Sequence, residues 1–101
     1  MNKRVELHYI LQDVLGSSNV YFQPPESLKI KYPAIIYSLS TINTRRADDK
    51  LYTKHKRYLV TVIDEDPDTD LVDKLIELPY CSFSNHYRMD NLNHYIFNLY
   101  Y

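Results

Sequence analysis

The stretch KHKRYLVTVI, residues 54–63, carries the clearest structural signal in the chain. Tyr58, Val60 and Val62 fall on one face of this stretch and the residues between them fall on the other, a period of two that is typical of a β-strand. Basic residues stand at its beginning, so we expect that end to be exposed. Residues 34–40 alternate in the same way. We expect the two segments to pair antiparallel at the centre of a sheet.

The segment between these strands, Thr41–Thr53, is polar and charged. Such a segment has too little apolar surface to bury. Loops of this length in compact domains commonly serve a function. We therefore expect a long β-hairpin arm or loop that leaves the body of the protein.

The N-terminal part predicts a helix followed by a short strand. Residues 2–15 place apolar side chains three and four positions apart, which is typical of an amphipathic helix, and Gly16 can end it. Residues 20–22 are β-prone and are followed by Pro24 and Pro25, so we expect a brief edge strand there.

A second helix is predicted after the central strand. Asp66 is a good N-cap and Pro67 suits the first helical position, so we expect the helix to begin there and to end before Pro79. Residues 80–89 and 93–101 are β-prone and enclose a plausible hairpin turn.

These elements predict one α+β domain that covers residues 1–101. The expected order is α-β-β-β-α-β-β, with an antiparallel or mixed β-sheet covered by two helices and with a long β-hairpin arm. The chain is short enough for a single hydrophobic core.

Composition excludes several classes of function. One glycine cannot form a glycine-rich phosphate loop, and one cysteine cannot form an internal disulfide. With 12 basic and 13 acidic residues the net charge is −1, which predicts no strong global attraction to nucleic acid. No long apolar run is present, so we expect no membrane partner. The eleven tyrosines favour contact surfaces between proteins.

No catalytic, cofactor or metal site is predicted, and we expect a protein that is not an enzyme. The acidic run Asp64–Asp70 begins like a calcium-binding loop but lacks the glycine and glutamate that such a loop needs later. Cys81 stands near His86 and His94 without a known nucleophile signature, and we interpret it as a buried structural thiol.

The charged residues are segregated along the chain. Half of the twelve cations fall within residues 45–57, and seven of the thirteen acids fall within residues 64–77. One interpretation is that the two patches meet head to tail between neighbouring subunits; others are an arm that contacts phosphates, or ordinary solvated charge. The candidate arm residues, at an interface or a lumen, are Arg45, Arg46, Asp48, Asp49, Lys50, Lys54, Lys56 and Arg57. The candidate complementary acidic patch is Asp64, Glu65, Asp66, Asp68 and Asp70.

The whole chain resembles the tail terminator and tail-completion proteins of long-tailed bacteriophages. The resemblance lies in the order of elements and in five stretches, none of them a catalytic signature. These stretches are Asn19–Pro25, Lys31–Tyr37, Lys56–Asp64, Pro79–Phe83 and Asp90–Tyr95.

This resemblance implies a structural virion protein of the tail or neck, assembled in the host cytoplasm. It implies a hexameric ring that caps the tail tube, faces the head-side connector and lets genomic DNA pass without sequence specificity. Its partners would be further copies of itself, the tail tube protein and a neck protein, and no cofactor is implied. Alternatives are another neck protein, such as a stopper or head-completion subunit, a nucleic-acid-binding module that uses the basic arm, and a small enzyme.

Overall fold

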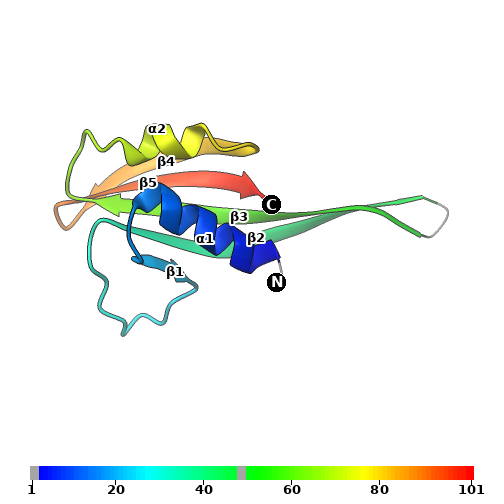
Figure 1. Cartoon of the computed structure of the whole chain (residues 1–101), viewed down its shortest axis with the longest axis horizontal. Coiled ribbons are helices and arrows are strands. Elements are labelled where there is room, and N and C mark those ends of the chain that lie inside the picture. Colours follow the sequence, from blue (N-terminus) through cyan, green and yellow to red (C-terminus); the bar gives the residue numbers. More distant parts are fainter. Residues whose placement is uncertain (1–2, 48–49) are drawn as a thin grey trace.

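The computed structural model describes residues 3–47 and 50–101 and has an α+β fold with one five-stranded sheet (Figure 1). The predicted fold class and element order are confirmed. The strands lie in the order β1-β2-β3-β5-β4. The elements are α1 (Lys3–Leu15), β1 (Val20–Phe22), β2 (Ala34–Ala47), β3 (Lys50–Asp64), α2 (Leu71–Ile76), β4 (Cys81–Met89) and β5 (Leu92–Tyr100).

The sheet is mixed rather than wholly antiparallel. The pairs β2–β3, β3–β5 and β5–β4 are antiparallel, whereas β1 pairs with β2 in parallel, with Val20 opposite Ile35. Residues 23–33 carry the chain back along the sheet, so β2 starts beside the start of β1. The predicted edge position of β1 and the predicted pairing of β2 with β3 are confirmed.

The hairpin turn between β4 and β5 lies where the sequence predicts it. Asp90 and Asn91 have φ angles of 54° and 63°. Asp and Asn tolerate this left-handed conformation better than most residues, and two such residues match the twist of the flanking strands.

Both helices cover the same face of the sheet, α1 over its middle and α2 near β4 (Figure 1). Leu7 and Leu11 of α1 and Leu71 and Leu75 of α2 pack with alternate residues of β2, β3 and β5. Each fully buried leucine contributes about 1.5–3 kcal/mol through apolar burial. Alternate residues of β5 are buried under the helices, and the residues between them, on the face without a helix, are half-buried.

The second helix begins later than predicted. It starts at Leu71 with Asp70 as N-cap, so the expected start at Asp66 and Pro67 is wrong. The Asp66 amide donates to Asp64 Oδ1 at 3.0 Å, and the Asp68 amide donates to Asp66 Oδ1 at 2.9 Å. These local side-chain bonds compete with helix formation, and the acidic segment forms successive turns instead.

The arm is a continuation of β2 and β3 beyond the sheet (Figure 1). Past the facing residues Ile42 and Lys56, the described parts of the two strands pair only with each other, as far as Ala47 and Lys50. The arm contributes to the elongated shape, 52 × 24 × 23 Å. Of the two predicted forms for Thr41–Thr53, the hairpin is the one that the structure has.

None of the helices in residues 3–47 and 50–101 has both the length and the apolar character needed to cross a bilayer.

Candidate interaction site at the base of the arm

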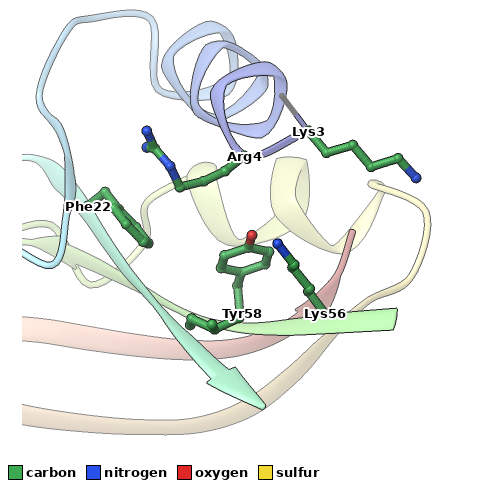
Figure 2. A pocket seen from close by; sticks show the side chains of 6 residues that line it. Lys3, Arg4, Phe22, Lys56 and Tyr58 are labelled. Carbon is green, nitrogen blue, oxygen red and sulfur yellow. The ribbon is translucent and has the colours of Figure 1, made fainter. Parts of the chain in front are cut away.

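A cationic pocket lies where the arm joins the body. Its volume is about 250 Å³, and α1, β1, β2 and β3 all contribute to its lining. Figure 2 shows Lys56 and Tyr58 rising from β3 toward the first turn of α1, with Arg4 extending on the side of Phe22 and Lys3 on the other. The lining residues are Lys3, Arg4, Phe22, Leu39, Lys56 and Tyr58.

Arg4 is held in place by two contacts. Its guanidinium carbon lies 4.5 Å from the centre of the Phe22 ring, a cation–π geometry. Its Nη1 donates to the Tyr37 hydroxyl at 3.3 Å. The Tyr37 hydroxyl also lies 2.7 Å from His8 Nδ1. Burial, and after it the charge of Arg4, lowers the pKa of His8.

Three cations therefore surround one small volume. Among the described residues, none of Lys3, Arg4 and Lys56 has a carboxylate within ion-pair distance. Burial raises the pKa of Tyr58, although the charge of Arg4 acts in the opposite direction. At neutral pH the Tyr58 hydroxyl is thus a protonated, potential hydrogen-bond donor beside the cations. A pocket that is lined by cations, a hydroxyl group and aromatic rings is suited to binding an anion.

The structure divides the predicted basic cluster. Lys56 lies on the helix-covered side with Tyr58, whereas Arg57 falls on the other face because successive strand residues alternate. Arg57 Nη2 donates to Ser40 Oγ at 3.3 Å, and its buried Nε has no hydrogen-bond partner in the part of the chain that the structure describes.

The remaining arm residues lie farther out. Arg45, Arg46, Lys50 and Lys54 belong to the paired strands of the arm. The predicted residues Asp48 and Asp49 lie outside the described residues.

Sequence reasoning missed Lys3 and Arg4. They open α1, far in sequence from the basic cluster, and they meet Lys56 only because α1 begins above that end of β3. The usable signal is that Lys56 shares a strand face with Tyr58, Val60 and Val62, the face that a helix had to cover.

The predicted acidic patch lies at the opposite end of the body (Figure 1). Two buried side chains of β5 anchor it: Asn93 Nδ2 donates to the Glu65 carbonyl at 3.4 Å, and the Tyr95 hydroxyl donates to the Pro67 carbonyl at 2.9 Å. Burial, and after it the charges of nearby aspartates, raises the pKa of Tyr95. The acidic segment is thus fixed on the sheet.

Only one acid of this patch has an ionic partner in the described part of the chain. Asp70 Oδ2 lies 3.5 Å from Lys74 Nζ, and both side chains are largely exposed. Such an exposed pair contributes little to stability. Apart from Asp70, the acids of the segment Asp64–Asp70 therefore carry negative charge that no ion pair in the described part of the chain compensates.

Cys81 and the nearby histidines do not come together. Cys81 is half-buried rather than fully buried as predicted, and burial raises the pKa of its thiol to about 11. His86 stacks on Tyr95, with ring centres 4.7 Å apart, and His94 stacks on Tyr87 at 4.6 Å. No group of three or more His, Cys, Asp or Glu in residues 3–47 and 50–101 is placed to hold a metal ion.

Comparisons with protein-family models and with curated proteins return no match for this chain. The functional argument therefore rests on the sequence and on the geometry of the arm, the cationic pocket and the acidic segment.

Proposed function

We propose that this chain is a subunit of a hexameric ring in the virion of a long-tailed bacteriophage, a tail terminator that caps the tail tube and joins it to the head-side connector. The resemblance in five sequence stretches supports this role. The structural observation that carries the proposal is the arm, whose described strands beyond Ile42 and Lys56 pair with no other element of the chain. An isolated two-stranded hairpin is marginally stable in water and gains from packing against another molecule.

The distribution of charge supports a head-to-tail contact between copies. Cations gather at the arm and its base, and the acidic segment lies at the far end of β3, so the two cannot meet within one chain. Lys50 and Asp64 are separated by fourteen residues along one strand, roughly 45 Å at about 3.3 Å per residue. A contact between unlike surfaces closes into a ring when the rotation permits.

The charge balance favours self-assembly over a nucleic-acid-binding module. With 12 basic and 13 acidic residues, the chain as a whole is nearly neutral, so a basic surface on one copy can be balanced by an acidic surface on the next. A DNA strand along the arm would leave the acidic segment without a partner. A different neck protein, such as a stopper subunit, would share the ring geometry and differ in the partner that it contacts.

Measurement of the assembled mass tests the proposal. Sedimentation velocity and native mass spectrometry of the purified chain, from dilute to concentrated solution, should show a closed hexamer that electron microscopy resolves as a ring. Added tail tube protein should bind this ring, whereas a stopper subunit should prefer the connector. A chain that stays monomeric at every concentration and on assembled tails contradicts the proposal.

A further inference from the structure

The pocket carries cations without a carboxylate partner, and the acidic segment carries carboxylates without a cationic partner, in the described part of the chain. Lys3, Arg4 and Lys56 lack a carboxylate partner among the described residues. Within the acidic segment, the carboxylates of Glu65 and Asp68 accept no hydrogen bond and form no ion pair in the described part of the chain.

We propose that the cationic pocket between α1 and β3 receives a carboxylate of the segment Asp64–Asp70 from a second copy of this chain. This assignment rests on the ring proposed above and names the contact that would close it. Glu65 and Asp68 supply the carboxylates, and the ammonium groups of Lys3 and Lys56 are their main partners.

The segment Asp64–Asp70 is largely exposed and already ordered, which suits it to enter a pocket. Glu65 and Asp68 are exposed, while the backbone between them is held by Tyr95 through Pro67. A segment that is already ordered loses little conformational freedom on binding. The pocket volume of about 250 Å³ accommodates a carboxylate side chain, and ammonium groups make short, strong hydrogen bonds to carboxylate oxygens.

The partner must be a second molecule. Lys56 lies within β3 and Glu65 lies nine residues farther along, just past the end of this extended strand, roughly 30 Å away at about 3.3 Å per residue. No rotation of side chains closes that distance. A nucleic acid is the less suitable occupant, because its phosphates would be repelled by the acidic segment of every neighbouring copy.

Exchange of charges between two variants tests the contact. One variant carries Lys3→Glu and Lys56→Glu, and the other carries Glu65→Lys and Asp68→Lys. Each alone places like charges at every contact, so self-association should weaken by about tenfold or more. In an equimolar mixture the two variants can alternate around the ring, so that every contact joins opposite charges. The mixture should therefore regain the mass of the wild-type particle.

The matched control carries Lys29→Glu and Lys31→Glu. Both lysines are exposed and lie outside the pocket, and the two substitutions change the net charge by the same amount as those of the pocket variant. This control should assemble like the wild type. Thermal unfolding of each variant establishes that it folds. If the pocket variant assembles like the control, or if the mixture regains nothing, the contact is wrong.

A second measurement needs no substitution. A carbodiimide joins a lysine to a carboxylate only at direct contact, so a Lys56–Glu65 or Lys56–Asp68 cross-link in the wild-type protein can arise only between copies. We expect this cross-link in assembled particles, and its absence there overturns the inference.

The two proposals fail in different ways. If rings form without the cross-link and also form in the pocket variant, the proposed function stands and this contact is wrong. If the cross-link appears in open, linear assemblies and no rings form, the contact stands and the proposed function is wrong. If the pocket variant keeps its ring mass but loses affinity for duplex DNA with a shallower salt dependence, the pocket is a phosphate site and the inference is wrong.

Discussion

Tyr37 joins the hydrophobic core to the rim of the cationic pocket. Its ring is fully buried, with Phe22 and Tyr58 as aromatic neighbours at 5.0 and 6.0 Å between ring centres. Its hydroxyl is the common partner of Arg4 and His8. This one side chain therefore fixes where α1 begins above the sheet.

Replacement of Tyr37 by Phe should lower the free energy of unfolding by about 1–2 kcal/mol, because the partly buried hydrogen bonds to Arg4 and His8 are lost while the ring is kept. Urea denaturation followed by circular dichroism measures the change. Tyr9→Phe is the matched control, since Tyr9 is 56% exposed. Equal stability of the two variants would show that the Tyr37 hydroxyl does not stabilise the fold.

His8 should make stability depend on pH. Burial, and after it the charge of Arg4, lowers the pKa of His8 below its ordinary value of 6.5, so the unfolded chain takes up a proton at a higher pH than the folded chain. The stabilisation is fully present above the ordinary pKa of 6.5 and is lost as the pH falls below it, through the lower pKa of the folded state.

The test compares the wild type with His8→Gln between about pH 7.5 and about pH 5.5. The wild type should lose more of its free energy of unfolding over this range, because glutamine does not titrate. Equal losses in the two proteins would mean that another group causes the dependence.

The elements were predictable to the extent that local patterns decide them. Strand alternation identified β2 and β3, and two β-prone runs around Asp90–Asn91 identified the hairpin of β4 and β5. The start of α2 was not predictable from capping preference alone, because Asp64 and Asp66 use their side chains to form turns.

The pocket lay beyond local reasoning for a different physical reason. Its cations come from the first turn of α1 and from β3, and only the packing of α1 over the sheet brings Lys3 and Arg4 to Lys56. The parallel pairing of β1 with β2 likewise depends on the path of residues 23–33 and not on the strand residues themselves.

The arm is an element that the body should fold without. Because Ile42 and Lys56 face each other, an Asn-Gly turn can replace residues 43–55 and close the hairpin there. The thermal midpoint should change by less than about 5 °C, since every core residue that the structure describes lies outside residues 43–55. Ring assembly should be abolished, and a smaller deletion of residues 45–50 should have the same effect. Rings formed by the armless protein would show that the arm is not an assembly element.

At the scale of the whole molecule, charge separation makes the protein a long dipole with a cationic arm end and an anionic loop end. Copies of such a molecule attract one another in one orientation and repel in the reverse one. Complementary charge of this kind mainly sets orientation and the rate of encounter.

Assembly should accordingly weaken with salt. The screening length falls to about 3 Å in 1 M salt, so the average mass measured by equilibrium sedimentation should fall between low salt and 1 M sodium chloride. The charge-swapped mixture should show the same dependence as the wild type. A mass that rises with salt would instead indicate assembly through apolar surface.

A pull on the arm by a neighbouring subunit reaches the core directly, because β2 and β3 run from the arm into the sheet as continuous strands on each side of its tip. Force along the arm acts parallel to the strands and perpendicular to the hydrogen bonds between β3 and β5. Those bonds are then loaded in shear, all at once, and must fail together. A sideways force instead opens a ladder one bond at a time. The arm is therefore mechanically strongest along its own axis.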